Sequence, residues 1–429
     1  MRRLCTLIGI LTSVGALLCA ASMQPLPASA SSSSSKPIVV GGLGDLVVGQ
    51  GVVQGFKAGI YRFNKAGGLE GRKIQFNNYV DDGYSPSAAL AGAQELVQND
   101  KVMTVVPVLS SSAAGDTASY LEENKVPFIG WSINSAFALA PTAGFSINGA
   151  QTNPDVEGVV GMSQLLVALK ATKNPSSVKM AFMAQDLPTG VSAENSLAGV
   201  AKYVGMRVVL KQANVPVLGV TSYAPYAQAV VESGANALYV LLSTSGAVGL
   251  SAALKAAGYR GLIVNGTTYF PGQLANQPNE AAALDGEYVE NEFPTNENDT
   301  PAVKQEEKDL ISTGQKPYLA QAVSVGYWSA IMFEQMLRAT LARVGGNPNL
   351  VTGTALQATV NKKFVYTDPI EGGIGAIDFP AAESIPTGCG TLVRIQGDEY
   401  RQVVKYQCLG AVNIATKKKY NEKTGQQVG

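Results

Sequence analysis

Histidine is absent from the 429 residues of this chain. An imidazole is required by Ser-His-Asp triads, by His-containing zinc sites and by the catalytic loop of protein kinases. The sequence therefore argues against most hydrolytic and metal-dependent chemistry, and we expect no catalytic residue and no metal ligand. Lys and Arg total 32, as do Asp and Glu, so no charge excess attracts nucleic acid or an anionic membrane.

The N-terminal segment has the pattern of an export signal. Arg2 and Arg3 precede the apolar run LCTLIGILTSVGALLCAA, and Ala28-Ser29-Ala30 is the small-x-small pattern that a signal peptidase accepts. We expect a signal peptide over residues 1–30. The run SSSSSK then predicts a flexible leader over residues 31–36.

Two alternatives to cleavage remain for this segment. The apolar run could stay as a membrane anchor, or Cys19 could carry a lipid, although Leu18 stands where lipoprotein processing requires a small residue. No later apolar stretch reaches the length that spans a membrane. We therefore expect an exported protein that is soluble in the periplasm or at the outer face of the cytoplasmic membrane, with Cys19 as a second anchoring route.

Cysteine is scarce, and only Cys389 and Cys408 follow the predicted signal peptide. They bracket the hairpin-like segment TLVRIQGDEYRQVVKYQ. In an oxidising compartment a disulfide is the simplest expectation, with two buried free thiols as the alternative. We expect this disulfide to lie in the C-terminal hairpin, away from any binding cleft, and to serve stability.

Strand-like and helix-like runs alternate from Lys36 onward. KPIVVGGLG, RKIQFNNYV and KVMTVVPVL are typical of strands, and the segments between them carry apolar residues at helical spacing. Ser85-Pro86 is an N-cap followed by a first-turn proline. The pattern restarts after Pro154, a long core helix follows over residues 318–344, and a β-rich tail begins at Gly375. The fold class is therefore α/β, with two doubly wound halves.

Three motifs resemble functional signatures without completing them. Gly42 and Gly44 begin a dinucleotide fingerprint, but Val47 replaces its third glycine, so we expect no cofactor. Gly130-Trp131-Ser132 begins a nucleophile elbow, but Asn134 replaces the last glycine and the chain has no histidine base. The cluster TNENDT lacks the glycine and glutamate of a calcium loop, and a solvated turn explains it better.

Hydroxyl groups gather where two predicted strands end. Ser110, Ser111 and Ser112 follow the third strand, and Ser132 and Asn134 follow the fourth. In an open parallel sheet, ligands bind beyond the carboxyl ends of the strands, where backbone N–H groups at helix starts favour a carboxylate or carbonyl oxygen. Plain N-capping is the alternative, but it explains one serine better than three. The pattern favours binding without turnover.

The region 64–102 carries a recognisable string. It reads N-x-x-GG-x-x-GR-x-I, then a strand that ends in DD, then P-x-x-A…A-x-x-LV-x-x-DKV. This string resembles the branched-chain amino-acid-binding family of periplasmic solute-binding proteins, the receptor subunits of ABC uptake transporters. Looser similarity covers nearly the whole chain after the predicted signal peptide.

The resemblance implies a type I periplasmic-binding-protein fold, in which two α/β lobes joined by three crossings close on a solute by hinge rotation. Residues 37–147 and 300–368 would form the first lobe, and residues 153–290 and 375–429 the second. The crossings would lie near residues 147–153, 290–300 and 366–375.

The resemblance also implies solute contacts, matched by position. In the first lobe they are Gln50, Ser111, Ser132 and Asn134, and in the second lobe they are Thr189, Ser243, Tyr269 and Phe270. Ser110 is a candidate contact from the serine cluster alone.

Tyr269-Phe270 stand where amino-acid binders keep an acidic residue for the ammonium group. This departure favours an aromatic or apolar carboxylate, or a neutral amide, over leucine. Trp131 and Phe270 would then supply flat walls for a ring. The alternative is that Trp131 packs in the core and that Asp186 receives the ammonium of an amino-acid-like solute.

The resemblance implies a permease and an ATPase as partners of a monomeric receptor that clamps a small molecule. A ligand-binding sensor module is the main alternative function. A secreted α/β enzyme is disfavoured by the missing histidine and the incomplete motifs.

Overall fold

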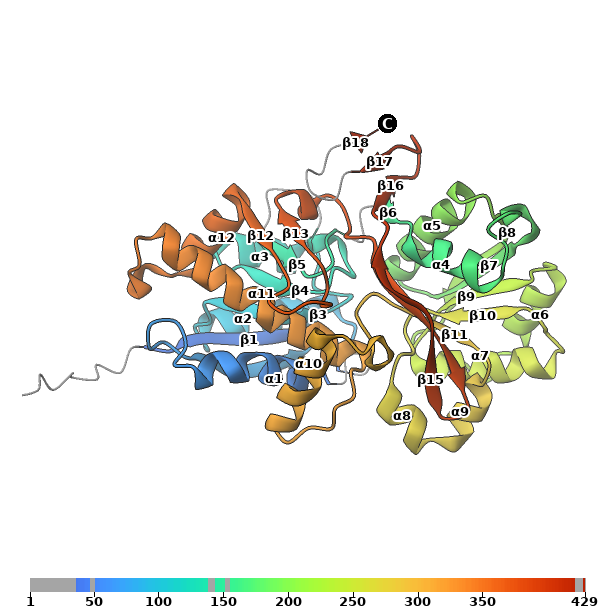
Figure 1. The fold of residues 1–429 in the computed structure, drawn as a ribbon, viewed down its shortest axis with the longest axis horizontal. Helices are drawn as coiled ribbons and strands as arrows, with labels where there is room; N and C mark the ends of the chain where they lie inside the picture. The colour runs from blue at the N-terminus through green and yellow to red at the C-terminus, as the bar shows by residue number, and fades with distance from the viewer. Residues whose placement is uncertain (1–35, 47–50, 138–142, 151–154, 421–426, 429) are drawn as a thin grey trace, which may run out of the picture. The chain divides into compact units, whose positions relative to one another are not determined.

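A computed structural model describes residues 36–46, 51–137, 143–150, 155–420 and 427–428. The predicted signal peptide, leader residues 31–35, Cys19 and Gln50 lie outside the described residues. Two large sheets, each flanked by helices, make up most of the described chain (Figure 1).

The first sheet has the strand order β2-β1-β3-β4-β5, and all its neighbouring strands are parallel. Its strands are β1 (Ile38–Gly44), β2 (Ile74–Asp81), β3 (Thr104–Leu109), β4 (Phe128–Gly130) and β5 (Gly144–Ser146). The helices around it are α1 (Val52–Lys65), α2 (Pro86–Gln98), α3 (Asp116–Glu123), α10 (Pro301–Ser312), α11 (Gln321–Arg343) and α12 (Gly353–Lys362). We call this group of elements the first lobe.

The second sheet has the order β15-β14-β11-β10-β9-β7-β8, parallel from β11 to β8 and antiparallel at β14 and β15. Its strands are β7 (Lys179–Gln185), β8 (Arg207–Val215), β9 (Ala237–Leu241), β10 (Leu262–Asn265), β11 (Tyr288–Asn291), β14 (Cys389–Gln396) and β15 (Glu399–Cys408). The helices around it are α4 (Val160–Ala168), α5 (Pro188–Tyr203), α6 (Ala224–Glu232), α7 (Thr244–Ala256), α8 (Pro271–Asn276) and α9 (Pro278–Leu284). We call this group the second lobe.

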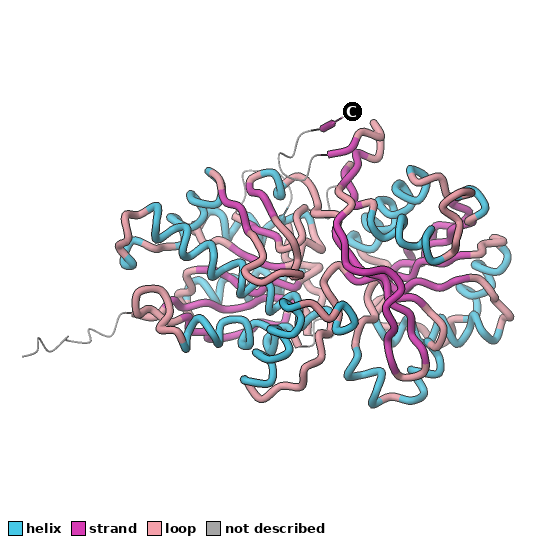
Figure 2. Tube along the Cα trace, viewed as in Figure 1, coloured by secondary structure: helices cyan, strands magenta, loops and turns pink. Residues whose placement is uncertain are grey.

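Short strands form two smaller sheets beside the lobes. One joins β12 (Phe364–Tyr366) to β13 (Ile377–Phe379), and the other has the order β18-β17-β16-β6. The strands of the latter are β6 (Val156–Gly158), β16 (Ala411–Asn413), β17 (Lys419–Tyr420) and β18 (Gln427–Val428). Figure 2 shows β14 and β15 as a long pair of strands within the strand-rich C-terminal region.

The predicted fold class, two doubly wound α/β halves, is confirmed. The local signals that predicted it are present in the structure. Ser85 caps α2, with its side chain accepting from the Ala88 N–H at 3.3 Å and Pro86 in the first turn. Gly67 and Gly68, with φ of 99° and 74°, end the segment after α1 in the left-handed region that favours glycine.

Each large sheet is covered on both faces. In β3, Val105 and Val106 are fully buried but belong to different apolar clusters, because successive side chains in a strand point to opposite faces. Ala181 and Phe182 in β7 divide in the same way between the two clusters of the second lobe. Burial on both faces explains the near-continuous apolar runs that marked these strands in the sequence.

The third crossing lies later in the chain than the sequence predicted. Ile374, Ile377 and Phe379 pack in the first-lobe core together with Phe145, so the segment after residue 366 stays in the first lobe. The chain joins the second sheet at Cys389, where β14 begins. The crossing was predicted at the glycines of DPIEGGIG. These glycines instead belong to a turn between β12 and β13. The other predicted lobe bounds stay a prediction.

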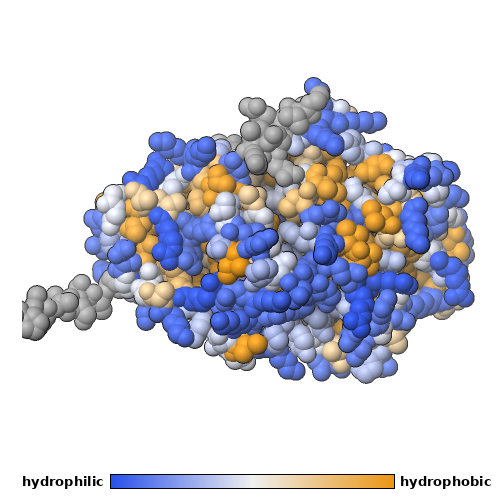
Figure 3. Space-filling view, in the orientation of Figure 1, coloured by the Kyte–Doolittle hydropathy of each residue, from blue (hydrophilic) through white to orange (hydrophobic). Residues whose placement is uncertain are grey.

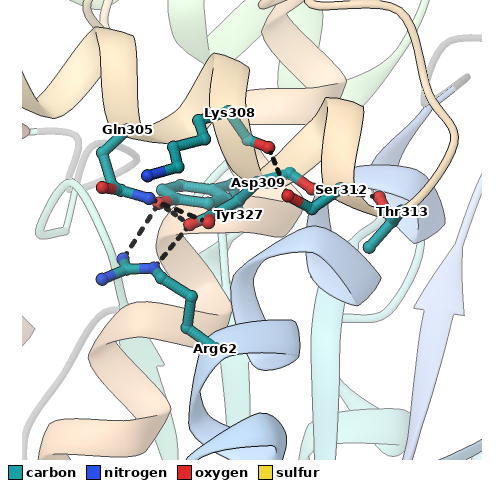
Figure 4. Close-up of polar contacts among 7 residues, drawn as sticks. All are labelled: Arg62, Gln305, Lys308, Asp309, Ser312, Thr313 and Tyr327. Carbon is teal, nitrogen blue, oxygen red and sulfur yellow. Dashed lines mark hydrogen bonds and ion pairs between the residues drawn. The ribbon is translucent and has the colours of Figure 1, made fainter.

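A polar network ties three helices of the first lobe together (Figure 4). The Arg62 guanidinium on α1 contacts the buried Asp309 carboxylate on α10, with 2.6 Å between Nε and Oδ2. The Tyr327 hydroxyl on α11 donates to the same oxygen at 2.9 Å, and Gln305 donates to the other oxygen at 2.9 Å. Because Asp309 receives donors from every side, its burial needs no further charge.

Exposed apolar side chains are scattered over the surface. On the face in view, Figure 3 shows hydrophobic residues in separate patches among hydrophilic ones. Leu218, Ile311, Leu350 and Val167 are among the most exposed, and they come from different elements. Single exposed apolar residues of this kind are normal in folded proteins. Of the helices in the described part of the chain, not one combines the length and apolarity needed to cross a membrane.

Helices α1 and α11 of the first lobe come into close contact at glycines. A Cβ at Gly55 would lie 1.8 Å from the Val323 carbonyl oxygen, and one at Gly326 would lie 1.9 Å from the Val52 carbonyl oxygen. Real side chains never approach backbone so closely, so the two helices can touch only where neither has a Cβ.

We predict that Gly326→Ala destabilises the protein by about 3 kcal/mol or more, because backbone of a second helix must move. Gly67→Ala is the control, since Gly67 has a left-handed φ of 99° but nothing within 4 Å. That change should cost only about 1–2 kcal/mol. Urea unfolding of both variants provides the measurement, and equal losses would contradict the close-contact explanation.

Candidate functional site

A cavity of about 230 Å³ lies between the first and second lobes. It is lined where the strands of both sheets end and by the crossing segments. Its first-lobe lining is Asp45, Tyr84, Leu109, Ser111, Trp131, Ile133, Gln321 and Ala322. Its second-lobe lining includes Gln185, Leu187, Thr189, Gly190, Tyr239, Leu241, Gly266, Thr267 and Glu290, and crossing residues include Asn148, Glu157, Glu292 and Gly388. Its volume is below the roughly 300–1,000 Å³ of sites for drug-sized ligands, so it suits a smaller molecule.

Trp131 forms an aromatic wall of this cavity. It is 9% exposed, and its ring packs edge-on against Phe293, with 5.9 Å between ring centroids. The Trp131 Nε1–H donates to Glu292 Oε2 at 2.8 Å, and Asn148 Nδ2 donates to the same oxygen at 2.7 Å. These bonds fix the indole plane and join the first crossing to the second. Trp131 therefore packs with the core and lines the cavity at the same time.

Glu290, near the end of β11, accepts a hydrogen bond from a tyrosine and lies close against a glycine. The Tyr239 hydroxyl donates to Glu290 Oε2 at 2.6 Å. A Cβ at Gly161, in the first turn of α4, would lie 2.1 Å from Glu290 Oε1, so only glycine leaves room for the carboxylate there. No described residue donates a hydrogen bond to Oε1. Glu290 is 9% exposed and lines the cavity, and Oε1 is not among the buried side-chain atoms that lack a partner, so a donor can reach it.

A second buried glutamate, Glu157 on β6, lines the same cavity and is 7% exposed. Its Oε1 accepts from the Gly158 N–H at 2.9 Å. Burial, together with the Glu292 and Glu290 charges, raises the pKa of Glu157 to about 8. Burial also raises the pKa of Glu290 to about 7, with Glu292 adding to the rise and the Tyr239 hydrogen bond opposing it. These carboxyl groups therefore hold protons far more readily than exposed ones.

The cavity contains acids without bases. Glu157, Glu290, Glu292 and the buried Asp45 line it, and no Lys or Arg is among its described lining residues. The described residues form no group of three or more acidic or sulfur side chains that could hold a metal ion.

This finding corrects one expectation from the sequence. The cleft was expected to offer no carboxylate to an ammonium group, apart from Asp186. Asp186 is exposed and does not line the cavity, whereas the three glutamates do. The signal in the sequence was the pair Glu290 and Glu292, two residues apart at the end of an apolar strand; Glu157, in the short strand β6, had no such signal.

Ser111 and Thr189 are the predicted contacts that line the cavity. The Ser111 hydroxyl oxygen is buried and has no partner among the described residues. Thr189 lies in the first turn of α5, directly after β7.

Three other predicted first-lobe contacts, Ser110, Ser132 and Asn134, do not line the cavity, and two of them organise the loops behind it. Ser110 donates to Asp82 and accepts from the Ser112 and Ala113 N–H groups, as a capping serine does. Asn134 donates to the Ser110 carbonyl oxygen at 2.6 Å. Ser132 is fully buried, and its backbone N–H donates to Asn148.

The other predicted second-lobe contacts also have structural partners outside the cavity. Ser243 caps α7 by accepting from the Gly246 N–H at 3.3 Å. The buried Tyr269 hydroxyl donates to Glu297 at 2.9 Å, and the Phe270 N–H donates to the Tyr400 hydroxyl at 3.2 Å. The substitution of an acid by Tyr269-Phe270 therefore concerns the lobe interior rather than the cavity wall.

The structure joins Cys389 and Cys408, the expected pair, across the first and last residues of the β14–β15 hairpin. The disulfide was expected to lie away from any binding cleft, but Cys389 lines the cavity at the third crossing. The disulfide thus fastens the two strands at the point where the chain passes between lobes.

The raised pKa values predict an unusual pH dependence of stability. Glu157 and Glu290 bind protons more tightly in the folded state than at their ordinary pKa of 4.5. Between that value and about pH 8 the unfolded chain therefore holds fewer protons, and the stability that these groups supply is lost as the pH rises. Glu290→Gln should raise the unfolding free energy of the ligand-free protein by about 1–3 kcal/mol near pH 8 and change it little near pH 5. Thermal unfolding at both pH values, with the exposed Glu123→Gln as control, checks this; equal effects of Glu290→Gln at both would contradict it.

Comparisons with known proteins support a family assignment. Residues 39–399 match the family model described as periplasmic binding protein. No curated protein matches the sequence. Similar solved structures include an ABC-transporter solute-binding protein from R. palustris in complex with 4-hydroxybenzoate, at 20% identity, a TM-score of 0.68, and coverage of 87% of this chain and 97% of that one.

A fatty acid ABC transporter substrate-binding protein from Thermomonospora curvata is 19% identical, with a TM-score of 0.72 and coverage of 91% and 96% of the two chains. A leucine binding protein from Thermotoga maritima is 14% identical, with a TM-score of 0.63 and coverage of 88% and 99%. At these identities the likeness to solved structures shows the fold alone. The family match spans most of the chain, so this protein belongs to the periplasmic binding protein family.

Proposed function

We propose that this chain is the extracytoplasmic solute-binding receptor of an ABC uptake transporter. It clamps a small amino-acid-like molecule, an aromatic or apolar carboxylate, or an amide between its lobes, and it delivers this solute to permease and ATPase subunits as a monomer. The observation that carries the proposal is the cavity between the lobes, lined by strand ends of both sheets. Parallel sheets bind ligands at this edge.

The lining matches a solute with an apolar body and a polar end. Trp131, Leu109, Ile133 and Leu241 provide apolar surface, and Trp131 is fixed edge-on by Phe293 and by its bond to Glu292. Ser111 and Thr189 provide hydroxyl groups from opposite lobes, so a solute that contacts both holds the lobes together. The proteins of similar fold that bind 4-hydroxybenzoate, fatty acid and leucine are consistent with such an amphipathic solute.

The same proposal covers location and attachment. The family is extracytoplasmic, and the N-terminal segment has the pattern of an export signal. We place the cleavage after Ala30, with lipidation of Cys19 as the alternative. Gln50, which lies outside the described residues, stays a proposed contact on the strength of its position alone.

The test is solute binding by the exported protein. Calorimetry against amino acids, aromatic acids, short apolar acids and amides should find a binder, and Ser111→Ala should weaken that binding by about fivefold to tenfold through the loss of one hydrogen bond. Ser119→Ala, which removes an exposed hydroxyl on α3, is the control and should leave affinity unchanged.

Solution scattering of the same samples should show a smaller radius of gyration when the solute saturates the protein, because hinge closure brings lobes together. The receptor proposal would be contradicted if the parent protein and the Ser119→Ala control bound none of these compounds. An unchanged radius of gyration at saturation would also contradict it.

A further inference from the structure

We propose that the transported solute carries a protonated nitrogen, and that Glu157 and Glu290, with Glu292 beside them, form the subsite that receives it. This inference rests on the proposed function and specifies its ligand. It assigns the choice of solute charge to residues on β6 and β11 that the sequence comparison by position did not select.

The two carboxylate oxygens of Glu290 differ in their contacts. One carboxylate oxygen is occupied by the Tyr239 hydroxyl at 2.6 Å, and the other has no donor among the described residues. This second oxygen is not among the buried side-chain atoms that lack a partner, so it is accessible to a donor. A hydrogen bond to a charged group contributes about 1.5–3 kcal/mol. Gly161 keeps this oxygen accessible, because any side chain there would occupy its position. A donor group of a solute in the cavity can therefore bind Glu290 Oε1.

The side chains around Glu157 and Glu290 supply no positive charge among the described lining residues. The titratable groups that face Glu157 and Glu290 are Glu292 and Tyr239, and both are acids. Asp45 adds another acid across the cavity, and the described lining contains no Lys or Arg. Buried like charges raise one another's pKa and lower stability unless a counter-charge compensates them. A solute with an ammonium group supplies that counter-charge, whereas a simple carboxylate adds to the repulsion.

An aromatic surface lies beside the glutamates. Trp131 lines the same cavity, and its hydrogen bond to Glu292 places the indole beside the acidic group. Aromatic faces attract organic cations and also cover apolar bodies. A protonated amine on an apolar or aromatic body therefore matches the acids with its nitrogen and Trp131 with its carbon skeleton.

A simple carboxylate could bind only while these glutamates keep their protons and donate to it. The two solute classes therefore have opposite pH dependence. Binding of a cation requires Glu157 and Glu290 to be ionised, so affinity rises from about pH 6 to about pH 8.5; binding of a carboxylate weakens over the same interval.

The experiment is equilibrium dialysis of the exported protein against a defined equimolar mixture, with mass spectrometry of what is retained. The probes are 2-phenylethylamine, phenylalanine, 3-phenylpropanoate and 3-phenylpropanamide, together with isopentylamine, leucine, 4-methylpentanoate and 4-methylpentanamide. Each set keeps one apolar body and changes the polar end. Retention of compounds with a protonated nitrogen should exceed that of the matched carboxylate or amide by about tenfold or more.

Variants test the assignment to residues. Glu157→Gln and Glu290→Gln, made separately, should each reduce retention of the nitrogen compounds by about tenfold and abolish the rise with pH. Glu306→Gln is the matched control, because Glu306 is also a fully buried glutamate with its pKa raised by burial to about 8, but it lies on α10 outside the cavity. It should retain the probes as the parent protein does, and thermal unfolding confirms that all three variants are folded.

The outcomes separate the two proposals. Preferential retention of the carboxylates or amides, or retention of amines that neither cleft variant weakens, overturns the cationic subsite and leaves the receptor proposal standing. Retention of no probe by folded protein counts against both.

Discussion

The burial of Glu157 and Glu290 in one cavity, beside the partly buried Glu292, is the constraint on which the rest of the cleft depends. Ionised carboxylates in such a place must be hydrogen-bonded, protonated or paired with a cation. The fold supplies the first of these in part: Tyr239 serves Glu290, and Trp131 and Asn148 serve Glu292. What the described residues do not supply is positive charge. In the proposed receptor, a cationic solute supplies that charge.

The same bonds connect binding to the crossings. Asn148 belongs to the first crossing, Glu292 to the second, and Cys389 begins the strand that follows the third. All of them line the cavity, so a solute that contacts these residues also contacts the segments where the lobes would rotate. In the proposed receptor, solute charge and lobe closure therefore depend on shared residues. The Arg62–Asp309–Tyr327 network, by contrast, stabilises the first lobe from within.

Local patterns predicted the sheets and helices well. Ser85-Pro86 begins α2 and the apolar runs became β1, β3, β7 and β9, because caps and side-chain periodicity act within a few residues. The cavity was harder to predict. Ser110 and Tyr269 carry suitable polar groups but spend them on Asp82 and Glu297, partners that only the three-dimensional packing brings close. Glu157 and Glu290 are more than a hundred residues apart, so no local pattern could join them. Gly375 and its neighbours imitated a crossing, because a turn and a hinge use the same residue types.

The most direct measurement is a crystal structure of the exported protein with the solute that it retains. We expect the solute in the cavity between the lobes, with its apolar body against Trp131 and a protonated nitrogen about 3 Å from a carboxylate oxygen of Glu290 or Glu157. A solute bound elsewhere, or one that turns only apolar atoms or a carboxylate toward these glutamates, would contradict the account.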